Sequence, residues 1–148
     1  MNQQTFDPLK LSNQICFPLY AASREVIKQY RPYLDEIDLT YTQYVTMMVI
    51  WEHKKISVGE LGRQLFLDSG TLTPVLKNLE SKGLVSRYRS PADERVLIVE
   101  ITDAGEALRD RAVTIPPRMA SCVSLTPEEA GTLYRLLYKI LGRNDEIE

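Results

Sequence analysis

The sequence has little of the residues on which metal sites and disulfide frameworks depend. It contains one histidine, His53, and two cysteines, Cys16 and Cys122, which lie far apart along the chain. Neither thiol has the close Cys or His neighbours of a zinc site, and this spacing is no disulfide framework. We therefore expect no metal and no cofactor, and we interpret His53 as a surface residue near a helix end. Reduced thiols are typical of a cytoplasmic protein.

Long apolar runs are also missing. No stretch approaches the roughly 20 residues that a membrane span needs, so we expect no membrane partner. The first residues have neither the basic start nor the apolar centre of a secretory signal. No phosphate-binding glycine loop, nucleophile elbow or pair of carboxylates stands out, and nothing therefore points to an enzyme.

The composition is that of an ordinary globular protein with one core. Hydrophobic residues make up 44% of the 148 residues and charged residues 26%. The net charge of −2 argues against a protein that coats nucleic acid. Residues 54–95, however, hold 8 basic and 5 acidic side chains, a net charge of +3, whereas the remainder holds 10 and 15, a net charge of −5. A local basic face is what nucleic-acid binding requires.

Residues 57–105 follow the order helix, turn, helix, hairpin. The expected elements are a helix at 57–65, a turn at 66–70, a helix from about Thr71 to Lys82, and strands at 84–89 and 96–101 joined by a polar loop at 90–95. Apolar residues recur at helical spacing in the helices and alternate in the strands. This order is that of a winged helix-turn-helix, in which the second helix enters a DNA major groove and the hairpin tip reaches a minor groove. The predicted fold class is mainly α with a small β-hairpin wing (α+β).

The second helix and the hairpin supply the residues expected to contact double-stranded DNA. Small hydroxyl residues and glycine at the helix start allow close approach, and the free backbone N–H groups there suit a phosphate. Arg95 suits the narrow, negative minor groove, and Asp93 can orient it through a bidentate pair. The predicted DNA-binding residues are Ser69, Gly70, Thr71, Thr73, Pro74, Lys77, Asn78, Arg87, Arg89, Asp93 and Arg95. The alternative is an ordinary solvated surface.

A long helix is expected at the beginning of the chain. Asp7 followed by Pro8 is a good helix start, Ser12 is a competing later start, and apolar residues continue at helical spacing to about Tyr30. Pro18 lies inside this range. It should remove one backbone hydrogen bond and kink the helix.

The chain after Tyr30 should break and begin again. Arg31-Pro32 interrupts the helical pattern, which predicts a short separate helix at 32–37. Thr40 and Gln43 have the spacing of a capping box, in which each side chain bonds the backbone of the other residue. They predict the start of the next helix.

The last third of the chain also has helical signals. Thr102 should cap a helix that runs towards Thr114, where 115–117, Ile-Pro-Pro, interrupts it. A second capping box at 126–129 starts the last helix, and Gly142 ends it. This helix carries a wide apolar stripe formed by Leu133, Leu136, Leu137, Ile140 and Leu141.

A winged unit alone does not need these flanking helices. Pairing with a second chain would bury the stripe of the last helix and would present two recognition helices to a pseudo-palindromic operator. We therefore expect a homodimer with one domain over 1–148, dimerisation helices at 1–38 and 106–148, and a DNA-binding lobe at 55–105. The alternative is that the flanking helices pack on their own domain.

Several segments resemble the MarR family of regulators over nearly the whole chain. They are 68–77 in the second helix, Asp93-Glu94-Arg95 in the wing, 101–105 after the hairpin, and 13–17 with Tyr20 and 22–24 in the first helix. The first-helix segment is similar to the organic-hydroperoxide-sensing branch, known as OhrR. The resemblance implies an obligate homodimer held by its terminal helices. It also implies a repressor that leaves its operator when one cysteine is oxidised.

Tyrosine hydroxyls can hydrogen-bond a thiolate and so lower the pKa that controls its reaction with peroxide. By resemblance, Cys16 matches the oxidised cysteine, and Tyr30 and Tyr41 match the tyrosines that bond it. Tyr20 matches a tyrosine near the site from the partner subunit. Pro18 stands where we expect a leucine-like residue, and we expect it to tilt the helix at the sensor.

The oxidant and the second thiol complete this interpretation. Apolar neighbours such as Phe17 and Met47 would suit an organic hydroperoxide better than hydrogen peroxide. By resemblance, oxidation proceeds from the thiolate to a sulfenic acid that a thiol captures. Cys122 resembles the resolving cysteine of the two-cysteine members, which form an intersubunit disulfide. One-cysteine members need an external low-molecular-weight thiol.

Two other functions fit the same residues. A MarR-type repressor can be released by a small phenolic ligand at the dimer interface instead of by cysteine oxidation. A thiol peroxidase that uses Cys16 as its catalyst would need turnover with a reductant and would have no specific DNA affinity.

Overall fold

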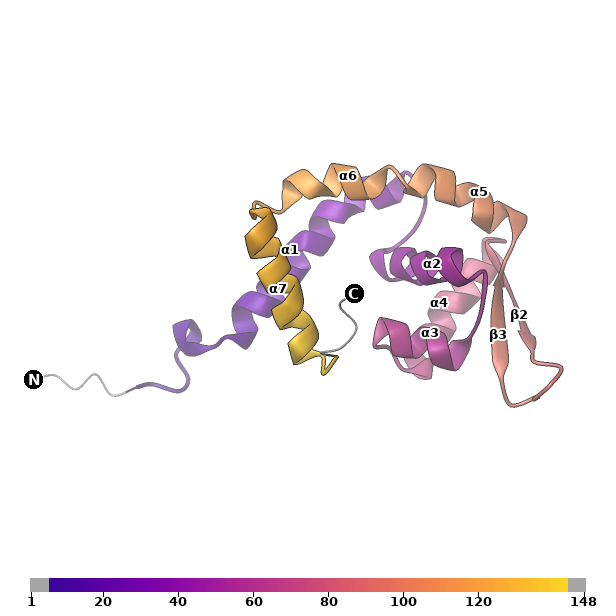
Figure 1. Ribbon diagram of the computed structural model, residues 1–148, viewed down its shortest axis with the longest axis horizontal. Helices are drawn as coiled ribbons and strands as arrows, with labels where there is room; N and C mark the ends of the chain where they lie inside the picture. Colours follow the sequence, from indigo (N-terminus) through magenta and orange to yellow (C-terminus); the bar gives the residue numbers. More distant parts are fainter. Residues whose placement is uncertain (1–5, 144–148) are drawn as a thin grey trace, which may run out of the picture.

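The computed structural model describes residues 6–143, and helices form most of this range (Figure 1). The helical elements are η1 Leu11–Asn13, α1 Cys16–Asp35, α2 Tyr41–His53, α3 Val58–Leu65, α4 Ser69–Ser81, α5 Asp103–Ala112, α6 Ile115–Met119, η2 Ala120–Cys122 and α7 Pro127–Ile140. The strands are β1 Lys55–Ser57, β2 Val85–Arg89 and β3 Leu97–Ile101. None of the helices in this range could cross a membrane. Residues 1–5 and 144–148, the ends of the predicted dimerisation ranges, lie outside the described residues.

The first helix begins later than the sequence predicted. The start expected at Asp7, or at Ser12, is wrong, because these residues form a turn and the short η1, and α1 begins at Cys16. Pro18 therefore lies in the first turn of α1, where backbone N–H groups have no acceptor within the helix. The predicted kink at Pro18 is wrong for this reason.

The break predicted at Arg31-Pro32 does not occur. Helix α1 continues through Pro32 to Asp35, so the separate helix predicted at 32–37 is wrong. An interior proline costs a helix about 3 kcal/mol in isolation. Packing around the end of α1 offsets this cost.

That packing joins the end of α1 to α6. Leu34 is buried, and the Arg118 guanidinium lies 4.1 Å from the centre of the Tyr33 ring. Arg118 also donates two hydrogen bonds to the Glu36 carboxylate, at 2.8 and 2.9 Å. These contacts hold the helix together beyond its proline, which a local sequence pattern does not reveal.

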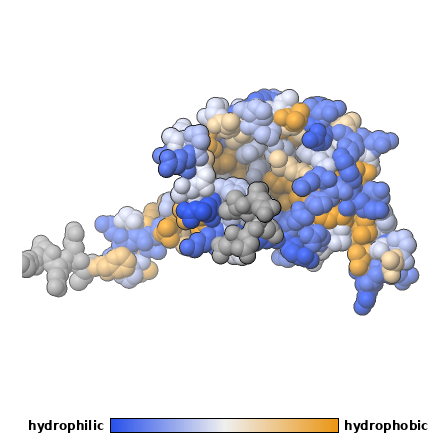
Figure 2. Space-filling view, viewed as in Figure 1, coloured by the Kyte–Doolittle hydropathy of each residue, from blue (hydrophilic) through white to orange (hydrophobic). Residues whose placement is uncertain are grey.

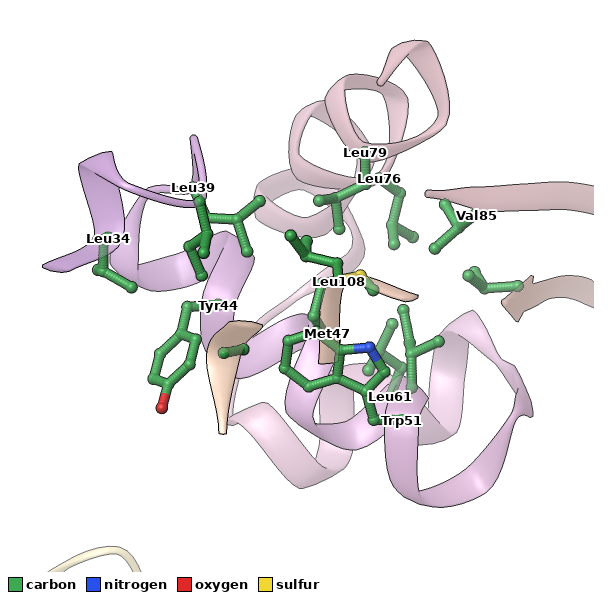
Figure 3. Close-up of a cluster of buried hydrophobic side chains, with 14 of the residues drawn as sticks. Leu34, Leu39, Tyr44, Met47, Trp51, Leu61, Leu76, Leu79, Val85 and Leu108 are labelled. Atoms are coloured by element: carbon green, nitrogen blue, oxygen red, sulfur yellow. The ribbon is translucent and has the colours of Figure 1, made fainter. Parts of the chain in front are cut away.

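Helix α2 lies at the centre of the core. Its predicted capping box is confirmed, since Gln43 N–H donates to the Thr40 hydroxyl and Thr40 N–H donates to the Gln43 side chain. Figure 3 shows buried side chains from α2, α3, α4, the sheet and α5 meeting around Met47 and Trp51. Trp51 donates its indole N–H to the Gly105 carbonyl at 2.8 Å, which ties α2 to the start of α5.

The predicted winged helix-turn-helix is confirmed, with one strand more than expected. The sheet is antiparallel with the order β1-β3-β2, and β1 before α3 is the strand that the sequence did not indicate. Its three residues are too few to show an alternating pattern. Helix α4 begins at Ser69, two residues before the predicted start, because Asp68 accepts a hydrogen bond from the Thr71 N–H. Gly83, with φ 76°, has the left-handed conformation expected after the helix.

The C-terminal third connects the wing to α1. The predicted caps at Thr102 and at 126–129 are confirmed. Helix α5 ends at Ala112, and the prolines at 116–117 then lie in the first turn of α6, where they are tolerated. In Figure 1, α5 and α6 run along the top of the molecule from the hairpin to α1. No residue of α7, which lies wholly within the described range, is buried.

Gly105 should be the position at which a single methyl group does most harm to this fold. A Cβ atom there would lie 2.2 Å from the Leu84 carbonyl oxygen and 2.8 Å from Ile101 Cγ1. We expect Gly105→Ala to lower the free energy of unfolding by about 1–3 kcal/mol, as overpacking does. Gly59→Ala is the control, because its Cβ would meet nothing within 4 Å. It should stabilise α3 by about 0.5–1 kcal/mol. Urea denaturation measures both, and equal stability of the two variants would contradict the prediction.

Candidate DNA interface and thiol site

The start of α4 presents a polar, exposed surface. Ser69, Gly70 and Thr71 are exposed in its first turn, and Asp68 holds this turn by accepting the Thr71 N–H at 2.7 Å. This hydrogen bond lowers the pKa of Asp68, so its carboxylate stays charged well below neutral pH. Thr73 is only half-buried and donates its hydroxyl to the Ser69 carbonyl at 2.7 Å. The turn is thus fixed by its own side chains.

The second turn of α4 presents exposed side chains, one of which is already hydrogen-bonded to α2. Pro74 and Lys77 are exposed, as expected of residues that face solvent or DNA. Asn78 is exposed too, but its side-chain oxygen accepts a hydrogen bond from Gln43 of α2 at 2.8 Å. Asn78 therefore keeps only its amide N–H groups for another partner. Sequence reasoning missed Gln43, which lies 35 residues away.

Arg87 lies at the base of the wing. Its backbone N–H and its guanidinium donate to the two carboxylate oxygens of Glu80, at 3.1 and 3.2 Å, and its side chain is only 17% exposed. The pair joins β2 to α4 and so links the hairpin to this helix. Arg89, two residues further along β2, is exposed.

Arg95 lies in the hairpin loop with a side chain that is 90% exposed. Its Nε and Nη2 donate to the two oxygens of Asp93, at 3.0 and 3.1 Å. The bidentate pair predicted from the sequence is therefore present. The Arg95 hydrogen bonds also lower the pKa of Asp93.

Cys16 lies at the first position of α1 and is exposed. Phe17 and Tyr20 beside it are 44% and 57% exposed, which is high for aromatic side chains on a helix. Arg24 donates a hydrogen bond to the Tyr20 hydroxyl at 3.3 Å and lies over its ring. Nothing in the described chain covers this end of α1 closely enough to bury its apolar side chains.

A cluster of three tyrosines lies at the other end of α1. The ring centres of Tyr30 and Tyr41 are 5.0 Å apart, and Tyr44 is 5.9 and 6.3 Å from them. Burial raises the pKa of all three hydroxyls, and burial with the neighbouring tyrosines raises the pKa of Tyr44 to about 12. All three are therefore protonated hydrogen-bond donors at neutral pH. Tyr44 was not among the predicted site residues, although its spacing of three residues from Tyr41 on one helix indicates that the two share a side.

Cys122 belongs to this cluster. Its thiol is close enough to Tyr30 to contribute to the raised pKa of that hydroxyl, and it packs against the core. The Sγ atom lies 3.8 Å from the Arg118 carbonyl oxygen. Met47, which we predicted beside the sensor, is fully buried and presents no surface to an oxidant.

Phe17 and Tyr20 lie beside Cys16 on α1, but the structure does not bring Cys16 to Tyr30, Tyr41 or Cys122 within one chain. Tyr30 follows Cys16 by 14 residues on the unbroken helix α1, which corresponds to a separation of about 21 Å. Tyr41 and Cys122 lie beside Tyr30 and are far from Cys16 for the same reason. The predicted site thus exists as two halves at opposite ends of α1.

Apolar side chains are exposed near both halves of the predicted thiol site. Large apolar side chains that are at least 40% exposed include Phe6, Leu9, Leu11, Ile15, Phe17, Leu19 and Ile27 near or on α1, and Val123, Leu125, Leu133, Leu136 and Ile140 near or on α7. Figure 2 shows orange, apolar patches along the N-terminal segment and in the hollow beneath α5 and α6. Exposed apolar area of this extent is typical of a surface that another chain covers.

Comparison with known proteins gives consistent results. The family model described as "Transcriptional regulator SarA/Rot" matches residues 28–111. The chain is 45% identical to the organic hydroperoxide resistance transcriptional regulator of Bacillus subtilis (strain 168), over 94% of this chain and 95% of that protein. It is 40% identical to the regulator SarZ of Staphylococcus aureus (strain USA300), over 90% of each chain.

Solved structures of AbfR, a protein of Staphylococcus epidermidis, are similar as well. Reduced AbfR bound to DNA has a TM-score of 0.76 at 34% identity, covering 89% of this chain and 91% of that one. Overoxidised AbfR bound to DNA also has a TM-score of 0.76, at 35% identity and with 89% and 93% covered. The disulfide form of AbfR has a TM-score of 0.66 at 34% identity, covering 88% and 92%.

The raised pKa of Tyr44 predicts how the free energy of unfolding changes at alkaline pH. The hydroxyl ionises near pH 10 in the unfolded chain and near pH 12 in the folded one. The contribution of this pKa shift to the free energy of unfolding is therefore fully present below pH 10, and it is lost as the pH rises towards 12. We expect Tyr44→Phe to reduce the loss of stability in this interval, measured by urea denaturation at a series of pH values. The absorbance of tyrosinate in the folded protein should lose its most alkaline step, and an unchanged titration would contradict the assignment.

Proposed function

This chain belongs to the family of MarR-type transcriptional regulators that includes SarA and Rot, and on this basis we propose that it is a homodimeric, DNA-binding repressor that leaves its operator when an organic hydroperoxide oxidises Cys16. One observation carries the redox part of the proposal. An exposed thiol lies at one end of α1, and tyrosine donors with a second thiol lie at the other end.

DNA binding is assigned to the lobe at 55–105. The exposed start of α4 enters the major groove, and Arg95 reaches the minor groove. Arg87 acts mainly by fixing the hairpin to α4 through Glu80. The DNA-bound structures of AbfR, at 34–35% identity, support this assignment.

Dimerisation is assigned to the terminal ranges 1–38 and 106–148. Covering α1 and α7 with a second copy buries the apolar side chains that one chain leaves exposed. An antiparallel arrangement of the two α1 helices places Cys16 at the partner's Tyr30 and the partner's Tyr41. Their protonated hydroxyls then donate hydrogen bonds to the Cys16 thiolate and stabilise this reactive form.

The oxidation has two steps. The Cys16 thiolate attacks the terminal oxygen of the hydroperoxide, the O–O bond breaks, and sulfenic acid and an alcohol form after one proton transfer. The partner's Cys122 thiol then attacks the sulfenic sulfur, the S–O bond breaks, and the departing hydroxide takes the proton of the thiol and leaves as water. The result is an intersubunit disulfide. The exposed ring of Phe17 provides an apolar contact for the organic group of the oxidant.

We assign release of DNA to the disulfide form. Overoxidised AbfR is bound to DNA, so an oxidised sulfur by itself does not prevent binding in that relative. The present structure has a higher TM-score with the two DNA-bound forms, 0.76, than with the disulfide form, 0.66. A conformation close to the DNA-bound one is expected for free thiols, which both cysteines have here.

Oxidation by cumene hydroperoxide should release the wild-type protein from its operator. Its affinity should fall towards the non-specific range, roughly 10³-fold or more. Cys16→Ser should bind the operator as tightly as the reduced wild type and should stay bound after the same treatment. Fluorescence anisotropy with labelled operator at fixed salt measures both. Release of the serine variant, or retention of fully oxidised wild type, would disprove the redox switch.

Cys122→Ser separates the disulfide from simple oxidation. After the same treatment it should stay on the operator and should not form the covalent dimer that the wild type shows on a non-reducing gel. Addition of a low-molecular-weight thiol together with the oxidant should restore release through a mixed disulfide. Release of Cys122→Ser without added thiol would assign the switch to Cys16 oxidation alone.

Arg95→Ala should weaken operator binding by about 1–3 kcal/mol and reduce the dependence on salt by about one phosphate-equivalent charge. Arg95→Lys is the matched control, because it keeps the positive charge and loses the planar pair with Asp93. It should retain the salt dependence and recover only part of the affinity. Binding measured over a salt series tests both, and an unchanged affinity of Arg95→Ala would make the wing dispensable.

A further inference from the structure

The segment before α1 is folded, but the rest of the described chain does not bury it. Residues 6–15, named here the N-terminal arm, project away from the rest of the chain in Figure 1. Phe6, Leu9, Leu11 and Ile15 in the arm are 74%, 91%, 58% and 85% exposed. The arm is nevertheless folded on itself.

Local hydrogen bonds hold the N-terminal arm. Asp7 accepts the Leu9 N–H at 2.9 Å, and the Asn13 side chain donates to the Asp7 carbonyl at 2.8 Å. The Gln14 side chain donates to the Pro8 carbonyl at 2.7 Å. A segment ordered in this way loses less conformational entropy when it binds a surface.

An apolar groove of about 450 Å³ lies between α2 and the α5–α6 segment. Its floor includes Tyr44, Met48 and Trp51 from α2, with Val113 and Pro116 on the opposite wall. Met48 and Val113 are 43% and 55% exposed, and nothing between residues 6 and 143 fills the groove. Figure 2 shows apolar surface in the hollow beneath α5 and α6.

We infer that the N-terminal arm of one protomer lies in the α2–α5 groove of its partner. The inference rests on the proposed function, in which Cys16 lies at the partner's Tyr41. Tyr41, Tyr44 and Met48 share one side of α2, so the groove continues from the tyrosine cluster along that helix. The arm continues directly from Cys16 and must lie on the surface next to this cluster.

The arm has the length that the groove requires. Tyr41 and Glu52, at the two ends of the α2 stripe, are separated by about 16 Å of helix rise. From Cys16 back to Leu9 the arm comprises η1 and turns, which at a rise of about 2 Å per residue span about 14 Å. Met48 lies about 10 Å along the helix from Tyr41, so Leu9 and Leu11 can enter the groove while Cys16 stays at the tyrosines.

The charges at the end of the groove match those of the arm. Glu52 and Arg109 line the groove, and neither forms an ion pair with any residue in the described range 6–143. The arm carries Lys10 and Asp7, one charge of each sign. Pairing Lys10 with Glu52 and Asp7 with Arg109 leaves the apolar side chains between them in contact with the groove. A second copy of this chain is thus the occupant that suits the groove.

Cross-linking between introduced cysteines tests this placement. In a Cys16→Ser, Cys122→Ser background, Leu9→Cys together with Met48→Cys should give a covalent dimer with a short bismaleimide. The control pair, Leu9→Cys with Ala107→Cys, uses an exposed position on the opposite face of α5 and should lose the covalent band. Each single-cysteine variant should lose it too. Gel filtration and operator binding verify that every variant is a folded dimer.

The outcomes separate this inference from the proposed function. No covalent dimer with the Met48 pair, or equal bands with both pairs, overturns the arm placement. If the wild type still forms its Cys16–Cys122 disulfide in that case, the proposed function stands and only the arm placement fails. If the wild type neither forms the disulfide nor releases DNA on oxidation, the proposed function fails instead.

Met48→Cys gives a second readout, because Met48 lines the groove and is 43% exposed when the groove is empty. In the Cys16→Ser, Cys122→Ser background, Leu9→Asp should increase the rate at which Met48→Cys reacts with a maleimide, as the arm leaves the groove. An unchanged rate overturns the inference. Tight binding of benzoate that changes Trp51 fluorescence equally in both proteins would assign the groove to a small aromatic ligand, which also overturns it.

Discussion

Helix α1 runs without a break from Cys16 to Asp35, and its length decides where the thiol chemistry can take place. The rise of the helix keeps Cys16 about 21 Å from Tyr30. Tyr30, Tyr41 and Cys122 can therefore act on Cys16 only from another chain. The apolar surface along α1 and α7 is what a second chain would cover. The same long helix thus separates the two halves of the site within a protomer and offers the surface that would reunite them in the proposed dimer.

The DNA-reading lobe is connected to these helices by a few specific contacts. Trp51 ties α2 to Gly105 at the start of α5, and Arg87 ties the hairpin to α4 through Glu80. Phe66, in the turn between α3 and α4, has a left-handed backbone (φ 56°), and its ring lies against side chains from the end of α7. Such a backbone is strained for a phenylalanine and persists only where its surroundings hold it. In the proposed dimer, a shift of the terminal helices would reach the recognition helix through this contact and would alter its distance from the partner's copy.

Local signals in the sequence predicted most of the fold. The capping boxes at 40–43 and 126–129, the left-handed Gly83 and the alternation in the hairpin depend on neighbouring residues alone, and all are present. The errors concern prolines and distant contacts. Pro18 lies harmlessly in a first turn, and Pro32 is tolerated because packing between α1 and α6 outweighs its cost. Strand β1 forms by pairing with β3, more than 40 residues later in the chain.

The residues of the candidate site could be predicted from the sequence, but the way in which they are brought together could not. Cys16 and Tyr30 are 14 residues apart in the sequence, but their distance in space follows only if the helix between them is continuous, which the prolines left open.

The continuity of α1 has a mechanical consequence. A disulfide holds its two Cα atoms within about 4.4–6.8 Å. If both cysteines came from one chain, this bond would tighten a single protomer. Because α1 keeps them apart, the bond that we propose would have to form between protomers, where it would fix the position of one copy relative to the other. Two recognition helices must match half-sites about 34–36 Å apart or a multiple of that distance. The proposed bond across the dimer would therefore act on a distance that operator binding depends on.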